Sequence, residues 1–97
     1  LGHFYLTYLL WKKLTAAPFF RITNVSSIAH KYLLGFGSET KPDWQDINFE
    51  TSYDSKLAYA RSKLYNVLFS EGLAQKVGKR GLVTSLHPGL VRTEWMN

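Results

Sequence analysis

No cysteine occurs in this chain of 97 residues, and methionine and proline are scarce, with one and three residues respectively. Without cysteine, the chain can form neither a disulfide framework nor a metal site built from thiolates. No run of 18 or more apolar residues occurs, so no segment of these residues is expected to span a membrane. The length limits the chain to one small domain at most.

The charged residues have a positive excess but form no concentrated basic tract. Lysine and arginine number 12 against 7 acidic residues, a formal net charge of +5. Lys12-Lys13 and Lys79-Arg80 are the only adjacent basic pairs. A basic module that binds nucleic acid is therefore the least favoured class, and we expect no nucleic-acid partner. Part of the charge is expected to face a phosphate-bearing cofactor.

The first predicted element is a helix over residues 1 to about 14. Its apolar positions recur at helical spacing, Lys12-Lys13 suit its C-terminal end, and Pro18 stops it. Tyr5, Tyr8 and Trp11 widen the apolar surface, which predicts burial on more than one side.

Two strands and a second helix follow. The pattern predicts short strands over residues 19–25 and 82–86, and the strongest helix of the chain over residues 55–76. Residues 28–53 form a long irregular connection, within which residues 46–49 are expected to be briefly extended. Two strands joined through a helix imply a parallel pair with a right-handed crossover, and therefore an α/β fold.

Polar residues follow both predicted strands. Ser26-Ser27 comes at the end of the first strand, and His87-Pro88-Gly89 ends the second with a turn. In parallel α/β sheets, ligands bind beyond the carboxyl ends of the strands. The two segments are therefore expected to meet at one ligand site, although each is also an ordinary turn sequence.

Tyr59 and Lys63 lie four residues apart on the helix between the strands, so their side chains share one face. A phenol ordinarily loses its proton only near pH 10, but a neighbouring cation favours the phenolate. Such a tyrosine can exchange a proton with an alcohol or a carbonyl. An isolated Tyr-x-x-x-Lys is more often a buried ring beside a solvated amine. The position between Ser27 and the Pro-Gly turn favours the catalytic interpretation here.

The order of these pieces resembles that of the short-chain dehydrogenase/reductase family. The matching segments are Leu1-Gly2-His3-Phe4, Asn24-Val25-Ser26-Ser27, Tyr59-Ala60-Arg61-Ser62-Lys63 and His87-Pro88-Gly89-Leu90-Val91-Arg92-Thr93. Asn66-Val67-Leu68-Phe69 extends the similarity to the retinol dehydrogenase-like branch, which includes the WW-domain oxidoreductase. The resemblance implies part of a Rossmann-like fold, a doubly wound parallel sheet.

The resemblance also implies roles for individual residues. Ser27 would polarise the substrate oxygen, Tyr59 would act as general acid and base, and Lys63 would assist the tyrosine and hold the nicotinamide ribose. The implied cofactor contacts are Tyr59, Lys63, Pro88, Gly89, Val91 and Thr93. His30 and His87 have no second ligand at metal-binding spacing, so we assign no metal.

The implied activity is the interconversion of an alcohol and a carbonyl with NADP or NAD, and the branch slightly favours NADP. The implied substrate is a small apolar, retinoid-like alcohol, aldehyde or ketone. The alternative is a non-catalytic dehydrogenase-like module that acts in interaction or regulation, against which the intact Ser27, Tyr59 and Lys63 argue. The branch implies an intracellular protein, either cytoplasmic or associated with the endoplasmic reticulum membrane through an N-terminal segment outside these residues.

Several family elements do not occur among the 97 residues. Missing are the glycine-rich phosphate-binding turn, the Asn-Asn-Ala-Gly segment, the tetrad asparagine, and the last strand and closing helix after Thr93. We therefore expect residues 1–97 to be part of a single NAD(P)-binding domain, without its N-terminal nucleotide-binding half and its C-terminal end. Such a piece buries too little to be reliably stable alone, so we expect it to have little or no activity in isolation and either to aggregate or to stay partly unfolded.

Other residues near the motifs receive weaker assignments. The long connection carries Lys31, Tyr32 and Trp44, which are candidates for lining a substrate entrance. Tyr65 falls out of phase with the apolar stripe of its helix and is expected to point away from the site.

Overall fold

The computed structural model describes residues 1–31 and 39–94, and those ranges contain two helices and two strands. The elements are α1 (Gly2–Ala16), β1 (Phe20–Val25), α2 (Ser55–Val77) and β2 (Gly81–Leu86), with short 3-10 helices at Ile28–His30 and Gly78–Arg80. The predicted helices and strands are confirmed, with ends that differ by two residues at most. In the described part of the chain, neither helix combines the length and the hydropathy that a bilayer crossing requires.

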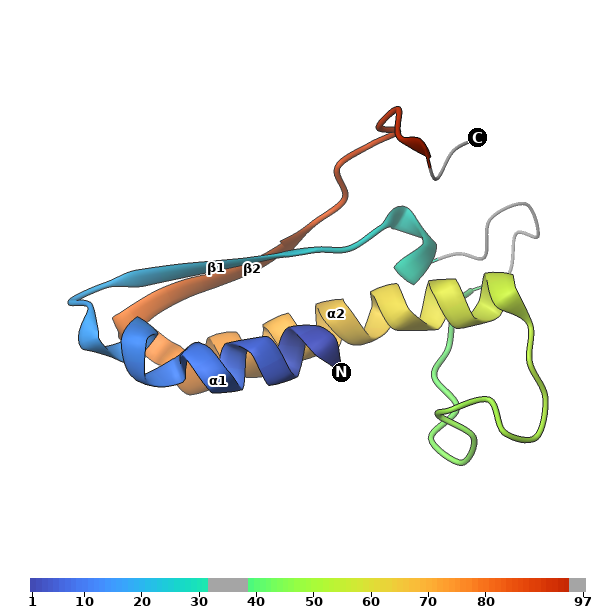
Figure 1. The fold of residues 1–97 in the computed structure, drawn as a ribbon, viewed down its shortest axis with the longest axis horizontal. Coiled ribbons are helices and arrows are strands. Elements are labelled where there is room, and N and C mark those ends of the chain that lie inside the picture. The colour runs from blue at the N-terminus through green and yellow to red at the C-terminus, as the bar shows by residue number, and fades with distance from the viewer. Residues whose placement is uncertain (32–38, 95–97) are drawn as a thin grey trace.

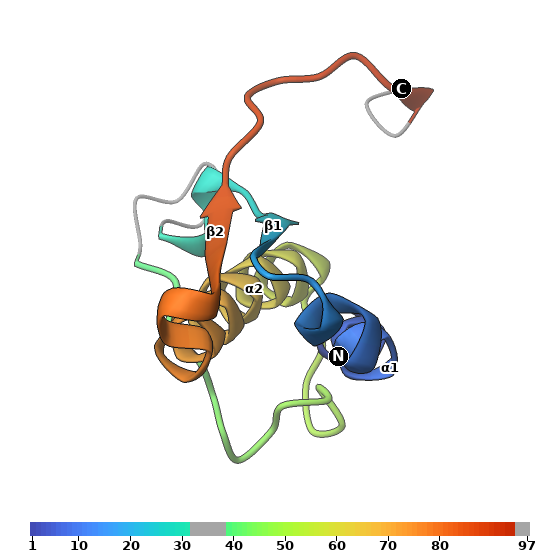
Figure 2. The ribbon, with the colours of Figure 1, turned by 90° about the vertical axis from the view of Figure 1, so that its left-hand side faces the viewer.

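β1 and β2 form a parallel two-stranded sheet, in register from Phe20 opposite Gly81 to Val25 opposite Leu86. α2 connects the two strands, which confirms the predicted α/β unit. Both helices lie on the same face of the sheet (Figure 1), with α1 on the β1 side of the molecule (Figure 2). Because the strands are parallel, their C-terminal ends reach the same edge of the sheet.

A small core lies between the sheet and the helices, where the strands begin. Phe20, Val77 and Val83 are its buried residues, and the Trp11 ring meets the Phe20 ring edge-on with 6.0 Å between centroids. A side chain at Gly81 would place its Cβ 2.7 Å from the Phe20 carbonyl oxygen. Glycine at this position therefore allows the two strands to start in this register.

The expectation that α1 is buried on more than one side is wrong, because none of its residues is buried. Trp11 and Leu14 pack against the core, whereas Tyr5 and Tyr8 are more than half exposed. The radius of gyration is 15.2 Å, compared with about 13 Å for a compact domain of this size. A helix on one face of a sheet is covered by that sheet on one side only, so much of the apolar surface of α1 is exposed among the described residues.

The connection over residues 41–54 is irregular, as predicted, but residues 46–49 form a turn rather than an extended piece. The Asp46 carboxylate accepts hydrogen bonds from the backbone N–H groups of Glu50, Thr51 and Ser52, which curls the chain around it. The bond from Thr51 is the main reason that the pKa of Asp46 lies below its usual range. The extended prediction is wrong because an aspartate that bonds its own loop favours a turn over a strand.

Two side chains of α2 anchor this connection. Arg61 Nε donates to the Lys41 carbonyl oxygen at 2.9 Å, and its guanidinium lies 5.2 Å from the centre of the Phe49 ring. The Tyr65 ring packs on the Trp44 ring with 5.6 Å between centroids. The connection is therefore held against the first half of α2, which carries the predicted catalytic tyrosine.

Candidate active site

The end of β1 presents two buried serines with different hydrogen-bond partners. Ser26 N donates to the Leu86 carbonyl oxygen at 2.7 Å, which extends the parallel pairing beyond the strands. Ser27 caps the 3-10 helix that follows, and its Oγ accepts a bond from Ala29 N at 3.2 Å. That bond uses a lone pair of Ser27 Oγ and not its proton, so the hydroxyl can still donate to a ligand.

α2 begins at a capped end and carries the tyrosine in its second turn. The Asp54 carboxylate accepts bonds from two backbone N–H groups of the first turn, which starts the helix at Ser55. Lys63 Nζ then lies 5.5 Å from the centre of the Tyr59 ring, within the range of a cation–π contact. The helix therefore brings the positive charge and the phenol together, as their spacing predicts.

The segment after β2 is tied to the segment after β1. His87 Nδ1 accepts a hydrogen bond from Ile28 N at 3.1 Å, which requires the tautomer with Nδ1 unprotonated. Gly89 has a φ of 82°, a left-handed conformation that most residues disfavour. The predicted turn at His87-Pro88-Gly89 is nevertheless wrong, because residues 87–93 continue without a turn and no backbone hydrogen bond among the described residues closes one there. Because of the bond from Ile28 to His87, the two strand-end segments border the same space.

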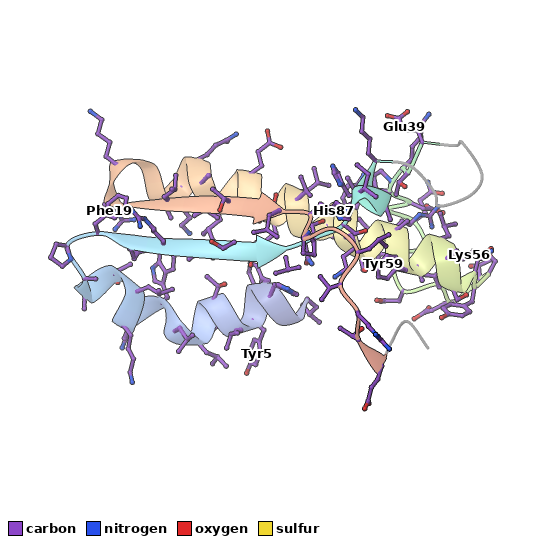
Figure 3. All side chains as sticks on the ribbon, turned by 90° about the horizontal axis from the view of Figure 1, so that it is seen from above. Tyr5, Phe19, Glu39, Lys56, Tyr59 and His87 are labelled. Carbon is purple, nitrogen blue, oxygen red and sulfur yellow. The ribbon has the colours of Figure 1, made fainter. Side chains whose placement is uncertain are left out.

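One cavity of about 700 Å³ lies in this space. Figure 3 shows Tyr59 beyond the ends of both strands, alongside the segment that follows β2. The residues to which the resemblance assigned catalytic or cofactor-binding roles all line this cavity, namely Ser27, Tyr59, Lys63, Pro88, Gly89, Val91 and Thr93. A ligand here meets a hydroxyl from a strand end, a phenol and a cation from a helix, and the backbone of the segment that follows β2.

The cavity combines polar groups with apolar surface, which is supplied by Val25, Ile28 and Leu90. A substrate oxygen in it can be hydrogen-bonded by a hydroxyl and a phenol, while apolar parts of the same ligand lie against the lining. Within residues 1–31 and 39–94, no group of three or more His, Cys, Asp or Glu residues is arranged to hold a metal ion.

Polar contacts between β1 and α2 were not predicted from the sequence. Asn24 Nδ2 donates to Ser70 Oγ at 2.8 Å, and both residues are buried. Ser26 Oγ donates to the Lys63 carbonyl oxygen, also at 2.8 Å. The sequence signal that could have indicated these contacts was helical spacing, because positions 63 and 70 lie two turns apart on one face of the helix.

Trp44, one of the three residues proposed for a substrate entrance, lies elsewhere. It lines a second cavity of about 510 Å³ together with Tyr65, so that prediction is wrong. Lys31 is exposed, and Tyr32 lies outside the described residues. Tyr65 does not line the Tyr59 cavity, as predicted, and its buried hydroxyl has no hydrogen-bond partner among the described residues. Trp44 was misplaced because its side-chain contacts with α2 depend on how the connection folds.

Comparisons with known proteins give a consistent result. Retinol dehydrogenase 12 from Homo sapiens is 43% identical to the chain over 95 residues, which are 97% of this chain and 28% of the relative. Retinol dehydrogenase 13 from Homo sapiens is 45% identical over 96 residues, 97% of this chain and 27% of the relative. Retinol dehydrogenase 14 from Mus musculus is 43% identical over 94 residues, 96% of this chain and 26% of the relative.

The chain therefore spans about a quarter of the length of the curated relatives it matches. No protein-family model matches it, and no solved structure matches it significantly.

Proposed function

We propose, from the premise that this chain belongs to the retinol dehydrogenase-like branch of the short-chain dehydrogenase/reductase family, that the whole protein is an oxidoreductase. The proposed reaction interconverts an alcohol and a carbonyl with NADP or NAD as cofactor. The observation that carries the proposal is the meeting of Ser27, Tyr59 and Lys63 in one cavity, at the C-terminal ends of two parallel strands.

We also propose that residues 1–97 are part of a single Rossmann-like domain. The 97 residues contain no Gly-x-Gly-x-x-Gly, the motif that binds the cofactor phosphates in such domains. The phosphate-binding half is proposed to lie in other residues of the same protein. The isolated 97-residue piece is accordingly expected to be inactive, so the experiments below use the full-length protein.

The lining of the cavity suits the nicotinamide end of the cofactor. Lys63 offers N–H donors for ribose hydroxyls, and Thr93 offers a hydroxyl. A Cβ built at Gly89 meets nothing within 4 Å, so a ligand can approach the backbone there. When bound, the nicotinamide supplies the hydride chemistry.

The side chains of this chain are proposed to handle the proton and the orientation of the substrate. Tyr59 exchanges a proton with the substrate oxygen through its phenol oxygen. Ser27 donates a hydrogen bond to the same oxygen, since the bond from Ala29 N leaves its proton available. Lys63 supplies positive charge beside the phenol. The three groups hold the reacting oxygen in one place, which lowers the entropic part of the barrier.

The proposed substrate is an apolar, retinoid-like alcohol or aldehyde. Val25, Ile28 and Leu90 supply apolar surface for it, and the relatives are named as retinol dehydrogenases. The alternative, a non-catalytic dehydrogenase-like module, predicts that the full-length protein binds NADP(H) without turning over.

The test is Tyr59→Phe in the full-length protein, assayed for retinol oxidation and retinal reduction with NADP(H) and with NAD(H). The change removes one oxygen atom, so kcat is expected to fall by about 10²- to 10⁴-fold, the usual contribution of general acid–base catalysis. Cofactor binding, followed by NADPH fluorescence, is expected to persist.

Tyr53→Phe is the matched control, because Tyr53 is exposed and is not among the described residues that line the cavity. It is expected to keep the wild-type rate. Ordinary turnover by Tyr59→Phe would contradict the mechanism. A wild-type protein that binds NADP(H) but converts neither substrate would support the non-catalytic alternative.

A further inference from the structure

Three consecutive residues at the end of β1 are hydrogen-bonded to positions on one face of α2. We term this set the β1–α2 ladder, whose pairs are Asn24–Ser70 at 2.8 Å, Val25–Asn66 at 3.3 Å and Ser26–Lys63 at 2.8 Å. Ser70 Oγ also donates to the Asn66 carbonyl oxygen at 2.7 Å, which links the first two pairs. Residues 63, 66 and 70 recur at helical spacing, so a single face of α2 supplies all three partners.

The ladder is specific for one placement of α2 along β1. Asn24, Ser26 and Ser70 are buried, and a slide of the helix would leave their polar atoms without partners. Apolar contact is less selective, because burial of apolar surface has no preferred direction. The core of Phe20 and Val77 lies where the strands begin, whereas the cavity lies beyond their C-terminal ends. Near the cavity the buried apolar residues are the small Ala29 and Ala60, and the hydrogen bonds supply the directional part of the placement of the helix.

Both partners of the last pair, Ser26 and Lys63, belong to or adjoin the site. Ser26 precedes Ser27 in the chain, and its hydroxyl holds the backbone of Lys63 itself. Tyr59 lies one helical turn before Lys63. We infer that Asn24, Ser26, Asn66 and Ser70 are positioning residues, which set α2 so that Tyr59 and Lys63 stand opposite Ser27.

This inference rests on the proposed function, in which three groups from two elements must meet one substrate oxygen. A displacement of about 1 Å between reacting groups can cost about a hundredfold in rate. Loss of one ladder bond loosens the placement without removing any group that lines the cavity. The expected loss of rate is therefore smaller than the loss caused by Tyr59→Phe, and substrate binding is expected to be largely retained.

The first test is Ser26→Ala in the full-length protein. We expect kcat to fall about tenfold, while KM for retinol changes less than about threefold, because alignment rather than binding is weakened. Amide hydrogen exchange over residues 59–66, measured without cofactor, is expected to accelerate several-fold. Thr15→Ala is the matched control, since it removes a hydroxyl-to-carbonyl bond of 2.9 Å that lies within α1. It is expected to change neither quantity.

A double variant separates positioning from general destabilisation. In the Tyr59→Phe background, Ser26→Ala is expected to change kcat by less than about twofold, because the proton-exchanging group that it positions is gone. A full tenfold effect in that background would overturn the inference. The inference would also be overturned if Tyr59→Phe inactivates the enzyme but Ser26→Ala keeps the wild-type kcat and the wild-type exchange rates.

The other outcomes are also decisive. Ordinary turnover by Tyr59→Phe would overturn the proposed function, and the inference with it. If Ser26→Ala does not fold, Asn66→Ala takes its place, because it removes the longer and more exposed bond to Val25. Unchanged kcat and unchanged exchange in Asn66→Ala would then overturn the inference.

Discussion

Gly81→Ala tests whether the register of the sheet depends on the close approach of its two strands. Gly81 lies opposite Phe20 in the first residue pair of the β1–β2 sheet. Its φ of −168° and ψ of −179° are extended backbone that alanine also adopts, so any cost arises from contact alone. The added Cβ would lie 2.7 Å from the Phe20 carbonyl oxygen, 2.9 Å from its Cε2 and 3.0 Å from its Cδ2.

The magnitude follows from what must move. The nearest atom is backbone oxygen, so it recedes only if the strands separate. The Phe20 ring is buried against Val77 and Val83, so its rotation would disturb the core. Overpacking of this kind costs about 1–3 kcal/mol, offset by about 0.4–1 kcal/mol because alanine is less free than glycine in the unfolded chain. The midpoints of these two ranges differ by about 1.3 kcal/mol, so Gly81→Ala is expected to lower the free energy of unfolding by about 1 kcal/mol, and by about 2.6 kcal/mol at most.

The assay is urea unfolding of the full-length protein, with Gly72→Ala as the matched control. Gly72 lies inside α2, and a Cβ built there meets nothing within 4 Å. Alanine is better than glycine in a helix by about 1 kcal/mol, so the control is expected to raise the unfolding midpoint while Gly81→Ala lowers it. A Gly81→Ala protein at least as stable as wild type would refute the contact argument.

Two further predictions concern the connection over residues 41–54. Arg61→Ala removes both the bond to the Lys41 carbonyl oxygen and the contact with the Phe49 ring, so chymotrypsin is expected to cleave the connection several-fold faster. Arg61→Lys is not expected to restore protection, because an ammonium lacks the planar fork, and unchanged cleavage of Arg61→Ala would show that the anchor lies elsewhere. The pKa of Asp46 is lowered chiefly by the backbone hydrogen bond from Thr51. The ionised carboxylate therefore stabilises the folded connection fully above the ordinary carboxyl pKa, and this stabilisation is lost as the pH falls through the lowered pKa. Amide exchange over residues 50–52, corrected for its intrinsic pH dependence, is expected to accelerate below that point. Asp46→Asn keeps an acceptor oxygen but does not titrate, so it should show no such acceleration, and the same pH profile in both proteins would contradict the assignment.

Much of the fold was predictable because its causes are local. The periods of α2 and the strands and the stop at Pro18 act over a few residues each. The four-residue spacing of Tyr59 and Lys63 placed them on one face for the same reason.

The errors arose where distant segments meet. Trp44 was assigned to the site from its place in the chain, but it packs on Tyr65 and lines another cavity. The apolar residues of α1 predicted a buried helix, but burial requires a second layer, and a two-stranded sheet covers only one side. Residues 46–49 became a turn because the Asp46 carboxylate binds backbone groups that follow it.

The sequence by itself determined the elements, their order and the chemical groups that each element presents, because helical and strand periods are properties of short segments. Only the tertiary structure decided the position of α2 along β1. That position depends on bonds such as Asn24–Ser70, whose partners are 46 residues apart in the chain. No local period encodes such a distance; it is selected when buried polar atoms find partners as the layers pack. The same packing determines which cavity receives Ser27, Tyr59 and Lys63.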